Sequence, residues 1–409
     1  MITLREYQTR SINMLYTWFE QHPEGNPCLV LPTGSGKSVI IAELCRDAVQ
    51  NWPETRILVL SHVKELLEQD ANKILAVWPE APVGIYSASI GMKRLAEPIT
   101  VAGIQSVRKR ALEVGHTDLV IVDESHLISH KDEGGYRSFI AELSEINPAL
   151  RVIGLTATPY RLGHGLITDK PAIFDDLIEP VSIEELVAHG YLCQLRSKVT
   201  AAKLDVSNVH LRGGEFIEHE LQAAVNAPLA NEQVVEEVIR RGEDRRSWLF
   251  FCSGVDHAYA MRDTLITQGI VAACVTGETP KNEREDILQR FKAGEIRAVS
   301  NANVLTTGFD HPDIDLIAMC RPTMSPGLYV QMAGRGMRPK EHIADCLVLD
   351  FAGNVERHGP ITAVQPPRKG TKGNGEAPVK VCEQCGELVA IAARVCPACG
   401  GAFPGPENK

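Results

Sequence analysis

Short apolar runs alternate with amphipathic stretches through the first part of this 409-residue chain. Residues 38–50 and 64–77 have the periodicity of amphipathic helices. The apolar runs around them are compact and rich in β-branched residues, as buried parallel strands are: CLVL (28–31), RILVLS (56–61), DLVIVD (118–123) and RVIGLT (151–156). This βαβ alternation predicts a doubly wound α/β sheet.

A second alternating block follows a looser region with several prolines and glycines. Its expected strands are WLFFCS (248–253), VAACVT (271–276), IRAVSN (296–301), LIAMC (316–320) and CLVLDF (346–351), with helices over 255–268 and 282–292. We therefore expect five parts: a domain over 1–165, a connecting region over 166–232, a second domain over 233–358, a flexible Pro/Gly/Lys-rich linker over 359–380, and a small cysteine module over 381–405.

The composition, 44% hydrophobic and 23% charged, is ordinary for a globular protein. No stretch of about 18 uncharged apolar residues and no apolar N-terminal run occur, so neither a membrane span nor a secretory signal is expected. The net charge of -10 means that any nucleic acid would have to bind a local basic surface. Seven of the eleven cysteines are scattered through apolar segments, which favours a reducing cytoplasm, bacterial or that of a host if the gene is viral.

The segment LVLPTGSGKS leads from a predicted strand through a glycine turn into a helix. Backbone N–H groups at such a turn favour bound phosphates, with Lys37 reaching the terminal phosphates and Ser38 ligating Mg²⁺. Leu31 stands where the strict phosphate-loop pattern has its first glycine, so a chance Gly/Ser turn is the alternative. The candidate loop residues are Thr33, Gly34, Ser35, Gly36, Lys37 and Ser38.

The segment DLVIVDESH places Asp123 at the end of a hydrophobic strand, where open α/β sheets bind ligands. Asp123 is suited to hold Mg²⁺, and Glu124 to orient or deprotonate an attacking water. Paired acids at a strand end also cap helices, which is the plainer interpretation. The two motifs in this order, each after an apolar strand, indicate a nucleoside triphosphatase.

The second block contains TTGFD (306–310) and QMAGRGMRP (331–339). The latter clusters Gln331, Arg335 and Arg338 on one side of a loop-to-helix segment. Arginine suits bidentate contact with a transferring phosphoryl group. An exposed basic helix is the alternative for this segment alone.

Together these segments resemble the motifs of superfamily 2 helicases of the DEAD/DEAH (DExH) type. The resemblance rests on LREYQ, LPTGSGKS, DESH, TATP (156–159), SNANVLTTGFD and QMAGRGMRP, in the family's order over residues 4–339. It implies two RecA-like domains that sandwich ATP. It further implies adenine reading by Gln8, approach of Gly308 and Asp310 to the nucleotide, arginines completing the site across the cleft, and coupling of nucleotide and nucleic-acid states through His126, Thr156 and Thr158.

The box reads DESH rather than DEAD, and the coupling motif begins with Thr156 rather than serine. Both departures argue against a DEAD-box RNA helicase. The segments LSHVKEL, RVIGLTATPYRLG, NVLTTGFD and LVLDFAGN, with the C-terminal cysteines, look most like the bacterial RadD-type DNA repair helicases. The resemblance also implies contacts to the nucleic-acid backbone from Ser61, His62, Lys64, Gln105, Ser106, Ser253 and Thr306.

The spacing Cys382-x₂-Cys385 and Cys396-x₂-Cys399, each pair followed by glycine, predicts a structural tetrahedral Zn²⁺ site, a zinc ribbon. Two disulfides or a redox pair are the alternatives. DNA docking and protein docking are equally open for this module, whose nearby basic residues are Arg368, Lys369, Lys372, Lys380 and Arg394.

From the sequence we therefore expect an ATP- and Mg²⁺-dependent DNA helicase or translocase of repair or recombination. Its expected partners are single-stranded or branched DNA, bound without sequence preference, and single-strand-binding or recombination proteins. Two alternatives stay open: a duplex translocase subunit of a restriction or remodelling complex, and a nucleotide-gated DNA-binding recruitment module.

Overall fold

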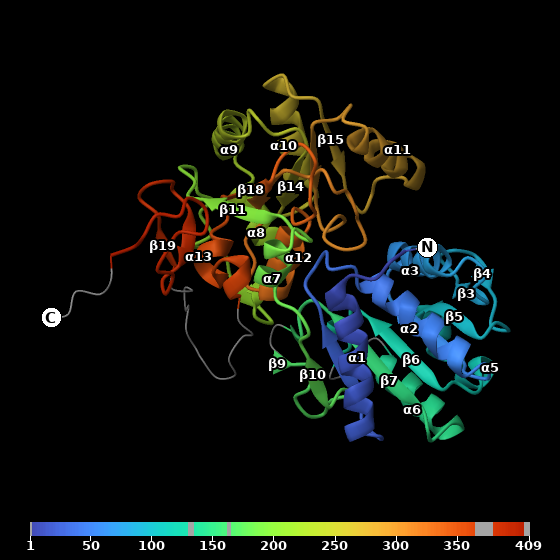
Figure 1. The fold of residues 1–409 in the computed structure, drawn as a ribbon. Coiled ribbons are helices and arrows are strands. Elements are labelled where there is room, and N and C mark those ends of the chain that lie inside the picture. The colour runs from blue at the N-terminus through green and yellow to red at the C-terminus, as the bar shows by residue number, and fades with distance from the viewer. Residues whose placement is uncertain (1, 130–134, 162–164, 365–378, 405–409) are drawn as a thin grey trace. The chain divides into compact units, whose positions relative to one another are not determined.

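The computed structural model describes residues 2–129, 135–161, 165–364 and 379–404. The chain divides into two units, Met1–Glu185 and Leu186–Lys409 (Figure 1). Each unit is an α/β structure built on its own sheet. None of the described helices combines the length and the apolar character that crossing a bilayer requires.

The first unit is built on an eight-stranded sheet whose neighbouring strands are parallel, except for an antiparallel pair at one edge. The strands in spatial order are β10 (Asp176–Ile178), β1 (Pro27–Val30), β7 (Arg151–Thr156), β6 (Leu119–Asp123), β2 (Ile57–Ser61), β5 (Ile99–Gly103), β3 (Val83–Ser87) and β4 (Met92–Lys93). A small separate hairpin pairs β8 (Tyr160–Arg161) with β9 (Gly165–Leu166).

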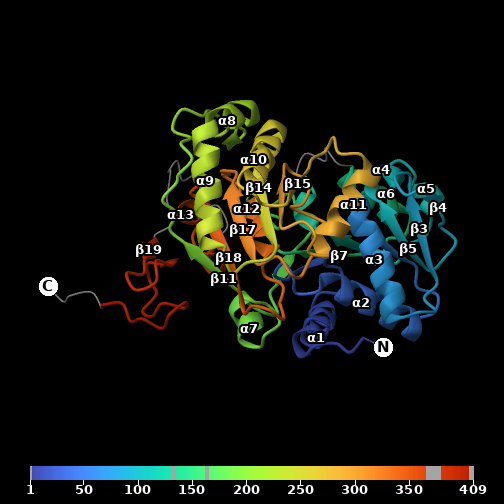
Figure 2. The same ribbon diagram turned by 90° about the horizontal axis from the view of Figure 1, so that it is seen from above.

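Helices cover both faces of this sheet. Leu58 and Leu60 of β2 lie in a core with α4 (Ile104–Val107), α5 (Ala111–Val114) and α6 (Tyr136–Ile146). The intervening Ile57 and Val59 are equally buried, on the face covered by α2 (Lys37–Asn51) and α3 (Lys64–Val77) (Figure 2). Burial on both faces explains why the strands read as continuous apolar runs. Helix α1 (Glu6–Gln21) contacts α2 and β1.

The second unit contains a six-stranded sheet in which every neighbouring pair is parallel. Its order is β11 (Gln194–Lys198), β18 (Asp345–Asp350), β17 (Leu316–Cys320), β14 (Trp248–Cys252), β16 (Ala298–Asn301) and β15 (Ala272–Val275). Trp248 and Phe250 pack in a core with α8 (Glu218–Val225), α9 (Pro228–Arg241) and α10 (Val255–Thr267). The other elements of this unit include α11 (Lys281–Lys292), α12 (Pro326–Gly334), α13 (Asn354–His358) and the hairpin β12 (Leu211–Arg212)–β13 (Glu215–Phe216).

The predicted fold class, two parallel-sheet α/β domains in tandem, is confirmed. Each of the nine expected strands is present, with bounds that differ by at most two residues. Residues 166–232, expected to connect the domains, instead supply an edge strand to each sheet: β10 pairs with β1, and β11 pairs with β18. These strands are short, and β11 reads QLRSK, so neither has the apolar run by which buried strands are identified.

The expected linker, 359–380, has structure at both ends. A short 3₁₀ helix covers Ile361–Ala363, and β19 begins at Val379. Residues 365–378, including Arg368, Lys369 and Lys372, lie outside the described part of the chain.

Candidate nucleotide site and C-terminal metal centre

Three neighbouring strands of the first sheet bring the nucleotide-site candidates of this unit to one edge. β7 lies between β1 and β6, with Val30 opposite Thr156 and Leu155 opposite Asp123. Because all three strands are parallel, their carboxyl ends meet at the same edge. The phosphate-loop segment, the acid pair and the TATP segment therefore lie next to one another.

The loop from Pro32 to Gly36 turns sharply before α2 begins at Lys37. Gly34 and Gly36 have φ angles of 87° and 84°, a region that L side chains rarely adopt. At Gly36 a Cβ atom would also come within 2.9 Å of the Gln8 side-chain nitrogen. The backbone N–H groups of the first turn of α2 are thus presented at the sheet edge, as phosphate binding requires.

Helix α1 holds this loop from its other side. The Tyr7 hydroxyl and the Gln8 side-chain amide both donate hydrogen bonds to the Ser35 carbonyl oxygen, the latter at 3.4 Å. Gln8 is itself fixed because its Oε1 accepts a hydrogen bond of 3.0 Å from the Arg5 backbone N–H. Gln8 was predicted from the sequence as a nucleotide-site residue, whereas Tyr7 was not. The position of Tyr7 next to Gln8 in LREYQ was the available signal.

The acid pair faces the lysine of the loop. Lys37 Nζ lies 3.8 Å from Glu124 Oε1, and Glu124 has the left-handed backbone conformation with φ 49°. A non-glycine residue in this region is under backbone strain, which the structure retains at the end of β6. Asp123 is buried and accepts a 2.9 Å hydrogen bond from the Glu124 N–H. Burial, followed by the charges of Asp70 and Glu124, raises the pKa of Asp123 well above its ordinary value.

His126 connects the acid pair with the TATP segment. Its Nδ1 lies 2.8 Å from Thr156 Oγ1 and 3.4 Å from Glu124 Oε2. Thr156 Oγ1 also accepts a hydrogen bond of 3.0 Å from the Thr158 N–H. The three predicted coupling residues therefore form a chain of contacts that starts at Glu124: His126 contacts Glu124, Thr156 contacts His126, and Thr158 contacts Thr156.

These residues fit a magnesium-bound triphosphate. The Ser35 and Thr158 hydroxyl oxygens are buried and have no hydrogen-bond partner among the residues that the structure describes. Lys37 shares the site with the carboxylates of Glu124 and Asp70, so a divalent cation would balance the charge of the site. The glycine loop, the N-terminus of α2 and Lys37 supply hydrogen-bond donors for phosphates. Asp123 supplies a carboxylate ligand for Mg²⁺.

The nucleic-acid candidates of the first unit follow two other adjacent strands. β2 pairs with β5, with Ser61 opposite Gly103. His62 and Gln105 are exposed after these strand ends, whereas Ser61 is fully buried. Lys64 Nζ lies 3.4 Å from Glu68, and the Ser106 hydroxyl accepts a hydrogen bond from the Ala88 N–H.

In the second unit, the residues of the last two motifs also contact one another. Arg338 Nε lies 3.1 Å from Asp310 Oδ1. The Arg335 guanidinium donates hydrogen bonds to the carbonyl oxygens of Phe309 and, at 3.4 Å, Gln331. Gly308 has a φ of 72°, so the TTGFD turn requires glycine there. The two motifs therefore form one cluster within this unit.

Ser253 and Thr306 are both buried. The Ser253 hydroxyl donates a 3.0 Å hydrogen bond to the Cys320 carbonyl oxygen at the end of the neighbouring strand. In the structure this hydroxyl supports the sheet edge rather than facing solvent, unlike the expectation for a backbone-contacting serine.

The four C-terminal cysteines converge on one point. Their sulfur atoms all lie within 4.8 Å of one another, including 3.6 Å for Cys382–Cys399 and 3.7 Å for Cys385–Cys396. A tetrahedral zinc with Zn–S bonds of about 2.3 Å separates its sulfurs by about 3.8 Å. All four thiols are free in the structure, without a disulfide among them. The geometry therefore fits a closed zinc site.

Both cysteine turns have the local structure that such a site needs. Gly386 and Gly400, with φ angles of 69° and 74°, follow Cys385 and Cys399. Burial opposes ionisation of Cys382, but the backbone N–H groups of Cys385 and Gln384, with the neighbouring thiols, lower its pKa to about 7. A thiol near neutrality is readily available as the thiolate that metals bind.

The cysteine module, which we define as residues 379–404, packs against the edge strand β11. It contains the hairpin β19 (Val379–Val381)–β20 (Leu388–Ala390). Glu387 is the central contact: its Oε1 accepts a 2.7 Å hydrogen bond from the Ser197 N–H, and its Oε2 lies 3.4 Å from Lys198 Nζ. Gln194 and Arg196 donate to carbonyl oxygens of residues 397 and 398. The module is therefore docked on the second unit.

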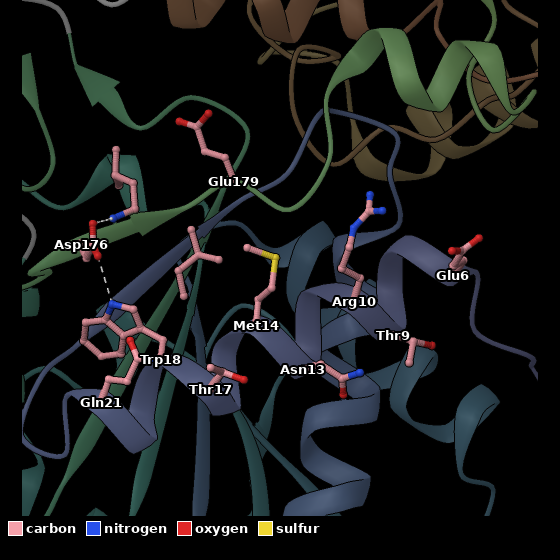
Figure 3. A pocket seen from close by; sticks show the side chains of 12 residues that line it. Glu6, Thr9, Arg10, Asn13, Met14, Thr17, Trp18, Gln21, Asp176 and Glu179 are labelled. Atoms are coloured by element: carbon pink, nitrogen blue, oxygen red, sulfur yellow. Dashed lines mark hydrogen bonds between the residues drawn. The ribbon is translucent and has the colours of Figure 1, made fainter.

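A hollow of about 730 Å³ on the first unit is separate from this chemistry (Figure 3). It lies between the outer side of α1 and strand β10, where Trp18 Nε1 donates a 3.0 Å hydrogen bond to Asp176 Oδ2. None of the site residues predicted from the sequence lines it.

Comparisons with protein families match each unit. Residues 1–161 match the family described as "Type III restriction enzyme, res subunit", and residues 230–340 match the "Helicase conserved C-terminal domain". These two regions contain the segments LREYQ, LPTGSGKS, DESH, TATP, SNANVLTTGFD and QMAGRGMRP.

The chain is similar to known proteins over most of its length. It is 29% identical over 366 residues to the Saccharomyces cerevisiae "Putative ATP-dependent helicase IRC3", covering 86% of this chain and 51% of that protein. It is 26% identical over 395 residues to the "DNA 3'-5' translocase XPB2" of Sulfurisphaera tokodaii, covering 87% and 83%. It thus spans about half of the yeast relative.

The fold is shared with a solved fragment of a putative HsdR subunit of a type I restriction enzyme from Vibrio vulnificus. The TM-score is 0.65 at 22% sequence identity, covering 88% of this chain and 66% of that one. At this identity the likeness establishes the fold alone.

Replacing Glu387 by alanine should detach the cysteine module. The change leaves the Ser197 N–H and the Lys198 ammonium without their buried acceptor, which costs about 1–3 kcal/mol. Limited proteolysis should release a C-terminal fragment faster than from the parent protein. Glu383→Ala, an exposed acid of the same module, serves as the control and should leave the rate unchanged. Equal cleavage of both variants would contradict the described docking.

Proposed function

Since the chain belongs to the DExH-type helicases of superfamily 2, we propose that it is an ATP-dependent DNA helicase or translocase. The observation that carries the proposal is the meeting of Lys37, Ser38, Asp123 and Glu124 at the carboxyl edge of β1, β7 and β6. Such a group is suited to phosphoryl transfer to water.

The first unit would bind the nucleotide. The N–H groups from Gly34 to Ser38 cradle the phosphates, and Lys37 neutralises the charge that develops on the terminal one. Ser38 and Asp123 hold Mg²⁺, which supplies charge neutralisation when bound. Glu124, aligned against Lys37, orients the attacking water and accepts its proton. Gln8, fixed on the back of the loop, reads the adenine.

The second unit would complete hydrolysis with Arg335 and Arg338, next to Gly308 and Asp310. Asp310 holds the Arg338 guanidinium in place by the 3.1 Å ion pair. Gln331 belongs to the same cluster through its carbonyl oxygen. A guanidinium that reaches the terminal phosphate is worth about 10³–10⁵ in rate in related chemistry.

Nucleotide state would be passed on through His126. Its contacts with Glu124 and Thr156 link the water-activating carboxylate to the TATP segment, so a change at the terminal phosphate can alter the end of β7. Thr158, hydrogen-bonded to Thr156, follows that change. Repeated cycles of grip and release on the nucleic-acid backbone would produce stepping.

We propose DNA, single-stranded or branched, as the substrate. His62, Lys64, Gln105 and Ser106 end or follow the adjacent strands β2 and β5, which favours contacts to phosphates without reading of base sequence. The similarity of residues 1–161 to a restriction-enzyme family and the name of the archaeal relative, a DNA translocase, support DNA over RNA.

A role in DNA repair or recombination, as in RadD-type helicases, is part of the proposal, with single-strand-binding or recombination proteins as partners. The restriction-family match favours one alternative: translocation on duplex DNA without strand separation. The third possibility, a nucleotide-gated recruitment module that does not move along DNA, would require no catalytic Glu124.

The cysteine module would bind one structural Zn²⁺ through Cys382, Cys385, Cys396 and Cys399. The support is the sulfur geometry and the small apolar core, whose buried members among the described residues of the module are Cys382, Leu388, Val389 and Cys396. So small a core leaves the folding energy to come from metal binding.

Single-stranded and forked DNA should stimulate ATP hydrolysis. A panel of forked, gapped, single-stranded and duplex DNA, scored for ATP turnover at several salt concentrations, measures this, and stimulation should fall as salt rises. No stimulation by any DNA would refute the motor. Strand displacement beside triplex displacement separates unwinding from duplex translocation.

The substitution Glu124→Gln should abolish turnover while nucleotide binding persists. Loss of the general base lowers the rate by about 10²–10⁴-fold, whereas the phosphate loop is unaffected. Fluorescent-nucleotide binding and ATP turnover measure the two effects. Glu142→Gln, an exposed acid on α6, is the matched control. Movement on DNA that survives Glu124→Gln would contradict the assigned role.

Elemental analysis should find about one Zn²⁺ per chain. A strong chelator should remove it and loosen the module from β11, because the apolar core there is too small to fold alone. Increased protease sensitivity after residue 364 reports the loosening. A metal-free protein with an intact, protease-resistant module would remove zinc from the proposal.

A further inference from the structure

Helix α3 carries a carboxylate on its buried side. Asp70 lies among Leu66, Leu67, Ala71 and Ile74 on the face that packs into the first unit. Its solvent exposure is 0%, and within the described part of the chain neither carboxylate oxygen makes a hydrogen bond of ordinary geometry; the polar side chain beside it is that of Ser38. A buried carboxylate without partners is unfavourable, so its presence on an apolar face requires an explanation.

The neighbours of Asp70 are the residues of the nucleotide site. The Ser38 side chain is next to it, and the charges of Glu124 and Lys37 act on it. Burial raises the pKa of Asp70 to about 7. Among the charged neighbours of Asp123, Asp70 contributes most to raising its pKa. Asp70 therefore lies behind the first turn of α2, where the phosphate loop ends.

Asp70 is not placed to share an ion directly with the other two acids. Among the described residues, the only group of three or more Cys, His, Asp or Glu close enough to hold one metal is the C-terminal cysteine group. Ser38, however, can connect Asp70 with the ion, because its side chain lies beside Asp70 and its oxygen is a proposed ligand of Mg²⁺. A serine that ligates a cation uses an oxygen lone pair, and its O–H proton must then point to an acceptor elsewhere.

We propose that Asp70 is that acceptor: a positioning residue that orients the Ser38 hydroxyl, so that its lone pair faces Mg²⁺, and adds an outer negative charge to the ion site. The inference rests on the proposed nucleotide site. The carboxylates of Asp70, Asp123 and Glu124 outnumber the one cationic side chain near them, Lys37, and a bound divalent cation would favour their ionised forms. The orphaned oxygens of Asp70 acquire a partner when Ser38 turns toward the ion.

The test is the Mg²⁺ dependence of nucleotide binding without turnover. A fluorescent, non-hydrolysable ATP analogue is titrated into the full-length protein at fixed Mg²⁺ concentrations and in EDTA. The substitution Asp70→Asn should raise the Mg²⁺ concentration for half-maximal binding about 10–100-fold, the usual effect of losing an outer-shell partner. Binding in EDTA should be unchanged or tighter, since a negative charge near the phosphates is gone.

Glu68→Gln on the same helix is the matched control, because Glu68 is exposed and its carboxylate lies 3.4 Å from Lys64 Nζ on the helix surface. This variant should keep the parent Mg²⁺ dependence. In a Ser38→Ala background, Asp70→Asn should have almost no additional effect, because Asp70 acts through that hydroxyl. Asp70→Glu keeps the charge but moves the oxygens, and should reproduce the loss if Asp70→Asn folds poorly.

The outcomes are distinct. An unchanged Mg²⁺ dependence in Asp70→Asn, or equal effects with and without Ser38, overturns the inference and leaves the nucleotide site standing. A lower melting temperature with unaltered Mg²⁺ dependence also overturns it, because Asp70 would then be purely structural. Failure of the parent protein to bind the analogue at saturating Mg²⁺ overturns the nucleotide site and this inference together.

Discussion

Parallel pairing of β1, β7 and β6 is the constraint on which the candidate site depends. With Val30 opposite Thr156 and Leu155 opposite Asp123, three segments that are far apart in the chain come to one edge. An antiparallel β7 would place the TATP segment at the opposite end of the sheet. The same rule brings the ends of β2 and β5 together, so that nucleotide and nucleic-acid candidates lie along one edge of one sheet.

Acidic side chains are concentrated at that edge, and they outnumber the one lysine among them. Lys37 faces Glu124, while Asp123 and Asp70 are buried nearby with raised pKa values. A cluster of acids around one lysine weakens the folded state until cations arrive, because buried charges need compensation. Strain is stored at the same place, in the left-handed backbone of Glu124. Binding of the proposed cation and phosphates would compensate for this charge and strain.

The C-terminal cysteine module brings four thiols together and also contributes to the second unit. Strand β11 is the edge of its sheet, and the module covers part of that edge through Glu387 and the carbonyl oxygens of residues 397 and 398. An uncovered edge strand offers unpaired backbone groups to other chains, so docking here also protects the sheet. Metal binding, folding of the module and protection of β11 are thus expected to change together.

Much of this protein could be predicted from its sequence because the information is local. Apolar runs identify nine strands. The glycines before Lys37 identify the candidate phosphate loop, and the two Cys-x₂-Cys pairs identify the candidate metal centre. Resemblance to known motifs added Gln8 and the TATP residues, whose roles stay predictions. The edge strands β10 and β11 escaped notice because β10 has only three residues and β11, QLRSK, lacks an apolar run.

Only the tertiary structure decided which distant residues meet. Helix α1 places Tyr7 against Ser35, α3 places Asp70 behind Ser38, and β11 receives Glu387. An acid at a position of α3 where the period requires an apolar side chain was a visible anomaly, but the sequence could not tell what it faces. The physical reason is that periodicity specifies which side of a helix is buried, whereas the packing of helix on sheet specifies what it is buried against.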